Sequence, residues 1–188
     1  MGKRNQAEAE VKFVLQKTEF DQILDILKEQ GFRYKSKEEL DDYFIEKIKS
    51  RHKGWDFKRL RAVDQKKFLL TVKKWVLDEN KNLVRLEDER HISKTTAQKL
   101  LARKQELLKI SKVRVNFKGS ILENNATVSI DDLKINGRHY YFLEVEILTT
   151  LVKSAKMRSI IKQWAAKKLE IRNTKEALSI LDFISHFR

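Results

Sequence analysis

An alternating stretch near the start of the chain decides the fold: Ala7-Glu8-Ala9-Glu10-Val11-Lys12-Phe13-Val14-Leu15. Its odd-numbered positions are all apolar, whereas the charged residues Glu8, Glu10 and Lys12 occupy even-numbered positions. Successive side chains of a β-strand point to opposite faces of the sheet. The period of two therefore predicts a strand with one apolar face and one charged face.

The same alternation returns along the rest of the chain. It covers residues 57–63, 67–76, 82–92, 110–118, 126–133 and 139–148, and Tyr43-Phe44-Ile45 marks a shorter strand. These segments and residues 7–15 predict eight strands. Apolar residues at helical spacing and capping residues predict four helices, at residues 18–30, 93–109, 151–169 and 173–187. This order favours an α+β fold, mainly antiparallel, whose sheet closes into a barrel with helices packed outside.

The composition is that of a globular protein with anionic partners. A chain of 188 residues that is 41% hydrophobic can build one core. We expect a barrel domain at residues 1–150 and a helical segment at residues 151–188 that packs on it. The net charge of +14 favours anionic partners, and the absence of cysteine excludes disulfides and thiolate metal sites. With no membrane span or signal peptide visible, we expect a cytoplasmic monomer or homodimer.

Charges of one sign recur two positions apart within the predicted strands. The pairs are Glu8/Glu10, Arg59/Arg61, Glu87/Glu89, Lys112/Arg114 and Glu144/Glu146. Residues i and i+2 share a face at a distance of roughly 7 Å, so like charges repel unless an ion neutralises both. A divalent cation does this for carboxylates, and a polyphosphate does it for lysine and arginine. A solvent-exposed face with mixed charges is the alternative, but five such pairs favour a site for metal ions and a highly charged anion.

These pairs belong to an ordered series of motifs that resembles the CYTH superfamily, the triphosphate tunnel metalloenzymes. The opening ExExK signature stands here as Glu8-Ala9-Glu10-Val11-Lys12. The later motifs are similar to Asp41-Asp42-Tyr43-Phe44, Arg59-Leu60-Arg61, Leu70-Thr71-Val72-Lys73, Arg85-Leu86-Glu87-Asp88-Glu89, Lys112-Val113-Arg114, Asp131 and Glu144-Val145-Glu146. The resemblance covers residues 7–148 in unbroken order.

The resemblance implies an eight-stranded closed tunnel with a hydrophilic interior that binds a triphosphate and one or two Mg²⁺ or Mn²⁺ ions. It implies these metal ligands: Glu8, Glu10, Glu87, Glu89, Asp131, Glu144 and Glu146. Of these, Glu87 and Glu89 could instead order the neighbouring arginines. It implies these triphosphate ligands: Lys12, Arg59, Arg61, Lys73, Arg85, Lys112 and Arg114. The residues expected to take part in catalysis are Lys12, Lys73 and Asp131.

The motifs leave the substrate open. The superfamily includes class IV adenylyl cyclases, thiamine triphosphatases and inorganic tripolyphosphatases. Our first hypothesis is a metal-dependent triphosphate hydrolase, with tripolyphosphate ahead of thiamine triphosphate and ATP. A class IV adenylyl cyclase comes second, and a non-catalytic module that binds polyphosphate or RNA 5′ ends comes third. Binding without catalysis would not need so many carboxylates, which weighs against the third hypothesis.

The surplus positive charge is not needed at the predicted site. The candidate residues comprise seven of each sign, so the whole +14 lies outside them. It could steer anions or hold a longer anion such as RNA or polyphosphate. The segment after about residue 150 is a lysine-rich helix and lacks the short tyrosine-containing element expected at the end of the family's tunnel. This departure leaves substrate size open.

Overall fold

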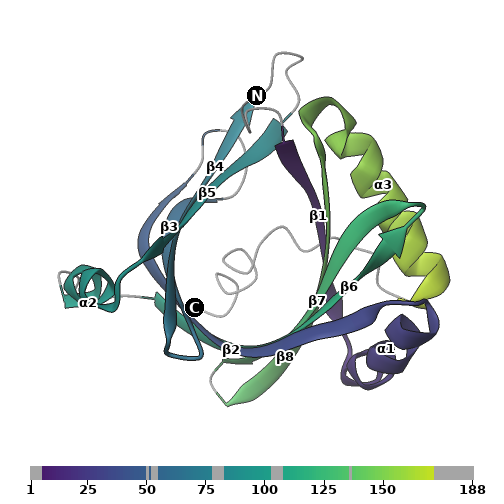
Figure 1. Cartoon of the computed structure of the whole chain (residues 1–188), viewed down its shortest axis with the longest axis horizontal. Coiled ribbons are helices and arrows are strands. Elements are labelled where there is room, and N and C mark those ends of the chain that lie inside the picture. The colour runs from purple at the N-terminus through teal and green to yellow at the C-terminus, as the bar shows by residue number, and fades with distance from the viewer. Residues whose placement is uncertain are drawn as a thin grey trace. The chain divides into compact units, whose positions relative to one another are not determined.

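The computed structural model describes residues 6–49, 51, 55–77, 83–102, 108–135 and 137–171. Within these ranges the chain forms eight strands and three helices (Figure 1). The strands are β1 (Gln6–Leu15), β2 (Arg33–Lys49), β3 (Trp55–Val63), β4 (Lys67–Leu77), β5 (Leu83–Ile92), β6 (Leu108–Ile121), β7 (Asn124–Ile135) and β8 (Arg138–Thr150). The helices are α1 (Lys17–Glu29), α2 (Lys94–Ala102) and α3 (Leu151–Lys168).

The strands are antiparallel and form one sheet in the order β1-β8-β7-β6-β2-β3-β4-β5. This confirms the predicted α+β fold with eight strands. The predicted closure into a barrel is wrong for this sheet, because β1 and β5 end the order and do not pair with each other within the described ranges. The run Glu87-Asp88-Glu89-Arg90 lies in β5. Charges along an edge strand oppose further pairing, which gives a physical reason for the open edge.

The chain divides into two compact units. Unit 1 comprises residues 1–37, 114–132 and 137–188, and unit 2 comprises residues 38–113 and 133–136. Strands β2, β6 and β7 contribute residues to both units. The predicted boundary at residue 150 stays a prediction, and the predicted helix at residues 173–187 lies outside the described residues.

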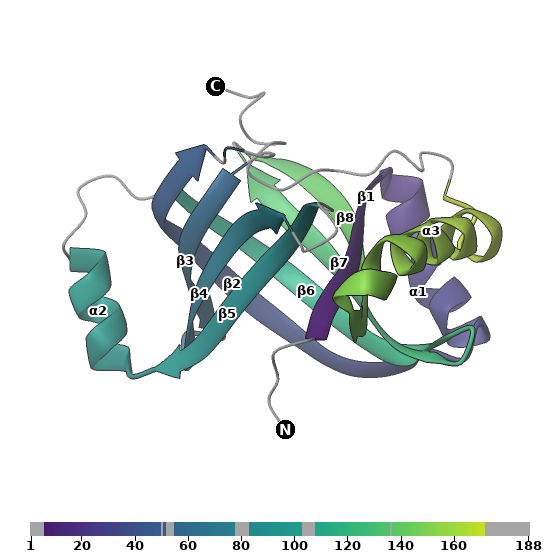
Figure 2. The same cartoon turned by 90° about the horizontal axis from the view of Figure 1, so that it is seen from above.

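The core of unit 1 lies between the apolar face of its strands and two helices. On β1, Val11 and Phe13 are fully buried, and they stand opposite Val145 and Leu143 of β8. Helix α1 contributes Ile23 and Leu27 to this core, and α3 contributes Met157, Ile161 and Ala165. Figure 2 shows α3 lying alongside β1. Burying the apolar face of β1 in this way leaves Glu10 and Lys12 on the opposite face of the same strand.

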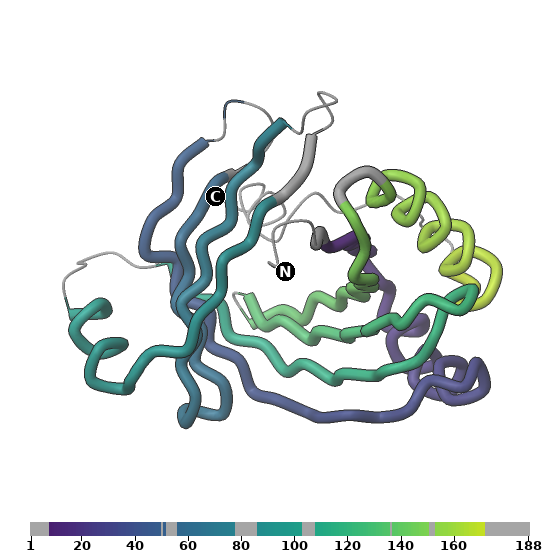
Figure 3. The backbone as a smooth tube through the Cα atoms, turned by 45° about the horizontal axis from the view of Figure 1, so that its top comes forward, coloured from purple at the N-terminus to yellow at the C-terminus, as the bar shows by residue number. Residues whose placement is uncertain are grey.

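The core of unit 2 is smaller. Leu60 of β3 and Leu70 of β4 are buried with Ala97 of α2, and Leu100 and Leu101 of the same helix pack against them. The tube in Figure 3 follows β3, β4 and β5 as consecutive antiparallel strands. With the apolar face covered by α2, the alternation leaves Arg59, Thr71 and Glu89 on the other face.

Two elements differ in length from the prediction. Strand β2 spans 17 residues, whereas the sequence predicts only residues 43–45. Its first seven residues are partly or fully exposed, so they lack the apolar alternation that predicts a strand. Helix α2 ends at Ala102 rather than near residue 109, and β6 begins at Leu108. Leu108 and Ile110 also fit a strand, and a short apolar run does not separate the two periods.

Replacing Gly119 by alanine is expected to destabilise the protein by about 1–3 kcal/mol, because the core has no room for an added methyl group. A Cβ atom at this position of β6 would lie 2.6 Å from Cδ1 and 2.7 Å from Cγ of Phe32. The Phe32 ring is buried and packs against Trp164, so it cannot turn aside freely. Urea denaturation measures the change. The neighbouring exposed Ser120→Ala should change stability by less than about 0.5 kcal/mol. An equal effect of both substitutions would contradict the packing explanation.

Candidate functional site

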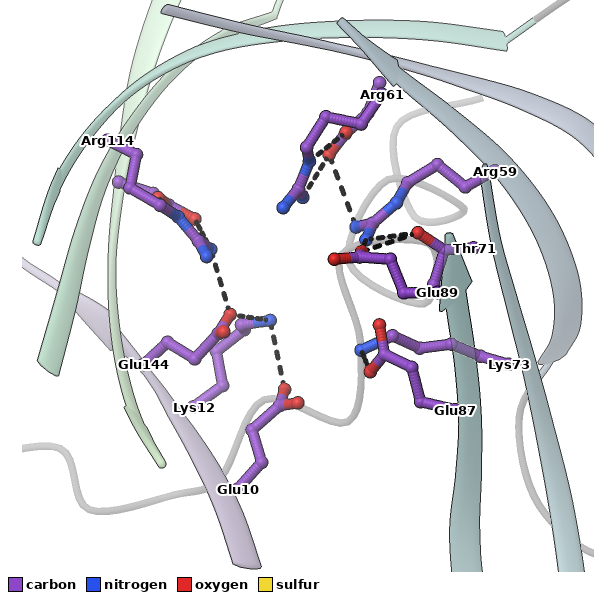
Figure 4. A network of polar contacts seen from close by, with 12 residues as sticks. Glu10, Lys12, Arg59, Arg61, Thr71, Lys73, Glu87, Glu89, Arg114 and Glu144 are labelled. Carbon is purple, nitrogen blue, oxygen red and sulfur yellow. Dashed lines mark hydrogen bonds and ion pairs between the residues drawn. The ribbon is translucent and has the colours of Figure 1, made fainter. Parts of the chain in front are cut away.

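Two strands of unit 1 bring acidic and basic side chains together. Lys12 stands opposite Glu144 in the β1–β8 register, and Glu10 stands opposite Glu146. Lys12 Nζ lies 2.7 Å from Glu144 Oε2 and 3.4 Å from Glu10 Oε1 (Figure 4). Acidic residues directly opposite each other repel, so a positive charge nearby would stabilise the pair Glu10 and Glu146. Lys12 supplies such a charge to Glu10.

Arg114 of β6 extends this network. Its Nε and Nη2 donate to Asp131 Oδ1 and Oδ2 at 2.6 and 2.8 Å, and Nη2 also donates to Glu144 Oε2 at 3.1 Å. Asp131 is fully buried, so this bidentate pairing keeps its charge compensated. We call Glu10, Lys12, Arg114, Asp131 and Glu144 the unit 1 network.

Lys12 remains cationic in this network. Burial by itself lowers the pKa of its ammonium group, but the negative charges of Glu144 and Glu10 act in the opposite direction and outweigh burial. The net pKa of Lys12 lies above its ordinary value. The residue is thus a fixed positive charge among carboxylates, as required of a phosphate ligand.

Unit 2 holds a second network, centred on Asp42. Arg61 Nε and Nη2 donate to Asp42 Oδ1 and Oδ2 at 2.6 and 2.8 Å, and Arg59 Nη1 lies 3.5 Å from Asp42 Oδ2. Asp42 is only 3% exposed. Burial by itself raises the pKa of Asp42, but Arg59 and Arg61 outweigh it and hold the pKa well below its usual range. Asp42 is therefore a buried carboxylate that holds two arginines in place.

Arg59, in the middle of β3, is linked by hydrogen bonds to residues of β4 and β5. Arg59 Nη2 donates to Thr71 Oγ1 at 3.3 Å, and Thr71 donates in turn to Glu89 Oε2 at 2.9 Å (Figure 4). Two residues further along β4, Lys73 Nζ lies 2.5 Å from Glu87 Oε2 of β5. We call Asp42, Arg59, Arg61, Thr71, Lys73, Glu87 and Glu89 the unit 2 network.

Arg59 is incompletely satisfied. The residue is 9% exposed, and within the described residues its Nε is buried without a hydrogen-bond partner. Burial lowers the pKa of Arg59, and Asp42 offsets part of that effect. An unpaired buried donor costs about 1–3 kcal/mol, so the position of Arg59 is maintained at the expense of one hydrogen bond.

The remaining predicted site residues are distributed over the same strands. Glu8 is exposed on β1, Glu146 is half-buried on β8, and Lys112 is 5% exposed on β6. Lys112 and Arg114 are two residues apart on one strand and so share a face. Arg85 lies in β5, but its side chain is outside the description.

Asp42 and Thr71 of the unit 2 network are absent from the predicted set of site residues, as are Asn116 and Ser129 beside the unit 1 network. Asp42 and Thr71 lie within the motifs, but neither belongs to a like-charge pair, so the charge pattern does not single them out. Asn116 donates to Ser36 Oγ at 3.0 Å and accepts from Ser129 Oγ at 2.8 Å. The signal for Asn116 and Ser129 is their spacing, since they stand two residues from Arg114 and Asp131 on the same face.

The carboxylates of unit 1 suit a divalent cation by their chemistry. Oxygen-only ligands are those that Mg²⁺ and Mn²⁺ prefer, and the register places Glu10 beside Glu146 on neighbouring strands. Among the described residues, however, no group of three or more acidic or histidine side chains is arranged to hold a metal ion. In this arrangement Lys12 and Arg114 supply positive charge to Glu10 and Glu144. The oxygen ligands fit a divalent cation by their chemistry, and the ligand set stays a prediction.

The chain belongs to the CYTH domain family, whose model matches residues 6–177. This match confirms the resemblance seen in the ordered motifs. Members of this family are metal-dependent enzymes that act on triphosphates. No functionally curated protein matches the chain at the level of sequence.

Several solved structures share the fold. A conserved hypothetical protein from Pyrococcus furiosus is 24% identical with a TM-score of 0.66, over 93% of this chain and 97% of its own. A Hippeastrum protein is 16% identical with a TM-score of 0.63, over 95% of each chain. Its description names an adenylyl cyclase that reveals a dominant triphosphatase activity. A Vibrio parahaemolyticus protein described as an adenylate cyclase is 18% identical with a TM-score of 0.66, over 96% of this chain and 99% of its own. At these identities the likeness establishes the fold.

Among the described residues, no helix combines the length and the apolar character needed to cross a membrane.

Proposed function

We propose that this chain is a divalent-metal-dependent triphosphate hydrolase whose preferred substrate is inorganic tripolyphosphate. The observation that carries the proposal is the charge arrangement of the two networks. Each holds basic groups against carboxylates on the polar face of its strands, and Arg59 retains an unused buried donor. A triphosphate would offer these basic groups further charged acceptors beside the carboxylates.

The residues of unit 1 would bind the cation and phosphate oxygens. Glu8, Glu10, Glu144 and Glu146 would hold Mg²⁺ or Mn²⁺, with Asp131 close by. The bound ion would neutralise phosphate charge and provide Lewis-acid polarisation of a phosphoryl oxygen. Lys12 would then give up its hydrogen bonds to Glu10 and Glu144 and donate to a phosphate oxygen. Arg114, held by Asp131, would donate to the same anion.

The residues of unit 2 would bind phosphate oxygens without direct help from the cation. Arg59 and Arg61 are aligned by Asp42, and Lys73 is aligned by Glu87. Preorganised donors stabilise the charge that develops on a transferring phosphoryl group at little cost of reorganisation. Glu87 and Glu89 then act by ordering the basic residues, and Lys112 and Arg85 complete the set of phosphate ligands.

A class IV adenylyl cyclase is the second candidate. It is favoured by the description of the Vibrio parahaemolyticus structure, whereas the dominant triphosphatase activity named for the Hippeastrum protein favours the hydrolase. The same basic groups would hold the triphosphate of ATP while the ribose 3′-hydroxyl attacks the α-phosphorus and pyrophosphate leaves. A non-catalytic polyphosphate-binding module is the third candidate, and the number of carboxylates disfavours it.

The purified chain is expected to release phosphate from tripolyphosphate faster than from thiamine triphosphate or ATP when Mg²⁺ or Mn²⁺ is present. The measurement quantifies phosphate, pyrophosphate and cyclic AMP from each substrate, and chelator-treated protein serves as the control. Cyclic AMP as the main product from ATP would establish the cyclase instead. Binding of every triphosphate without turnover would establish the non-catalytic module.

A further inference from the structure

Unit 1 contains two neighbouring cavities at the ends of β7 and β8. One cavity of about 620 Å³ is lined by residues that include Lys118, Glu146 and Leu148. The other, of about 540 Å³, is lined by residues that include Leu148, Lys153 and Lys156. Both are bounded by Asn124 and Leu148, so they are adjacent. Their lining residues run from Glu146, on β8, to Lys153 and Lys156 in the first turns of α3, and we call the two cavities together the groove.

The helix that borders this groove is strongly basic. Helix α3 carries six basic residues and no acidic residue, whereas α1 in the same unit carries two basic and four acidic residues. Lys153 and Lys156 are exposed, and no ion pair to either is found among the described residues. The surplus positive charge of the sequence thus gathers in part beside the groove.

We infer that this groove binds the part of a linear inorganic polyphosphate that extends beyond the three phosphates held at the proposed site. The inference rests on the proposed function, because Glu146 belongs to the predicted metal ligands. Lys118, Lys153 and Lys156 offer three ammonium groups along the groove, which complements a chain with a negative charge on every phosphate. The acidic residues in the lining, Glu123 and Glu146, would meet this anion through a divalent cation that bridges carboxylate and phosphate.

The lining favours polyphosphate over RNA. Proteins that bind single-stranded nucleic acid combine a basic groove with aromatic side chains on which bases stack. The cavities are lined by lysine, asparagine, threonine, glycine, glutamate, methionine and aliphatic residues, and none of the lining residues that the structure describes is aromatic. Leu148 is 61% exposed where the two cavities meet, but an aliphatic side chain offers no stacking surface. The groove therefore fits an anion without bases.

A binding experiment on the full chain tests the inference with paired variants of one helix. The groove variant is Lys153→Gln with Lys156→Gln, and the matched control is Lys167→Gln with Lys168→Gln in the last turn of α3, outside both cavities. End-labelled long-chain polyphosphate is titrated by fluorescence anisotropy, with and without Mg²⁺, at about 0.15 M salt, where surface charges farther apart than about 8 Å are screened. The groove variant is expected to bind about tenfold more weakly than wild type, and the control less than about twofold. Hydrolysis of tripolyphosphate should be the same for all three proteins.

Several results would overturn the inference. Equal weakening by both pairs would indicate diffuse attraction to the helix rather than a groove. If the wild-type protein bound long-chain polyphosphate no more tightly than tripolyphosphate, there would be no binding site beyond the three phosphates. If 5′-triphosphorylated RNA bound more tightly than polyphosphate, and this binding depended on Lys153 and Lys156, RNA would be the ligand of the groove instead. If instead the two pairs differ as expected but no triphosphate is hydrolysed, the groove stands and the proposed hydrolase fails.

Discussion

Replacing Lys12 by methionine is expected to lower kcat/KM for tripolyphosphate by about 10²–10³-fold, the usual cost of removing one preorganised electrostatic group. Lys12 Nζ bridges Glu144 and Glu10, and its raised pKa keeps it charged at neutral pH. Methionine keeps the volume of the side chain but removes the charge. Both phosphate binding and the balance of charge among the carboxylates are then weakened. Initial rates at several tripolyphosphate concentrations measure the loss.

Lys17→Met is the matched control for this substitution. Lys17 is an exposed residue of α1 that pairs with Asp21, so its removal also breaks one lysine–carboxylate pair. An exposed pair of this kind contributes little to stability, and activity should stay within about twofold of wild type. A folded Lys12→Met protein that retains more than about a tenth of the wild-type kcat/KM would exclude Lys12 from the site.

Replacing Asp42 by asparagine is expected to reduce the free energy of unfolding by about 3–5 kcal/mol, the cost of removing one partner from a buried ion pair. Asp42 is 3% exposed and accepts a bidentate pair from Arg61 while Arg59 lies 3.5 Å away. Asparagine keeps the shape but leaves two guanidinium groups without their shared counter-charge. Urea denaturation measures the shift in midpoint at unchanged slope.

Asp41→Asn provides the comparison on the adjacent residue. Asp41 accepts from Gln65 and Ser111 and pairs with Lys109, whose ammonium group is largely exposed. This exposed pairing predicts a smaller loss, of about 1 kcal/mol. Adding Arg61→Met to Asp42→Asn should recover part of the stability, because one uncompensated charge is removed. Equal losses for Asp41→Asn and Asp42→Asn would refute the role given to Asp42.

The stabilisation by Asp42 also has a defined pH dependence. Its folded pKa lies below the unfolded value of about 3.9, so its contribution is complete above that pH and declines as pH falls towards the folded pKa. The difference in stability between wild type and Asp42→Asn should therefore stay constant from neutral pH to about pH 4 and shrink below it. If the difference in stability between the two proteins changed between pH 5 and pH 7, the pH dependence would belong to another titratable group.

The alternation of β1 shows how much the sequence determines. A period of two places Val11 in the core and Lys12 on the other face without knowledge of any partner strand. The pairing of Lys12 with Glu144 was not predictable, because register depends on residues separated by more than a hundred positions. For the same reason, the ordered motifs predicted the identities of the basic residues but not which carboxylate each of them contacts.

Other features depended on contacts that the sequence does not display. Strand β2 begins at Arg33, in a segment too polar for its pattern to predict a strand. Its hydrogen bonds come from neighbouring strands. Asp42 lies within one of the motifs, yet its role as the counter-charge of two arginines follows only from the β2–β3 register, which places it opposite Arg61. The edges left at β1 and β5 likewise depend on long-range pairing.

The two faces of β1 constrain how this protein can change over generations. Substitutions on its charged face can alter chemistry while the apolar face stays buried. Insertion or deletion of a single residue, however, would move Val11 and Phe13 to the polar face and drive charges into the core. Natural variation in this strand should therefore consist of exchanged residues, with changes in length confined to the connections between elements.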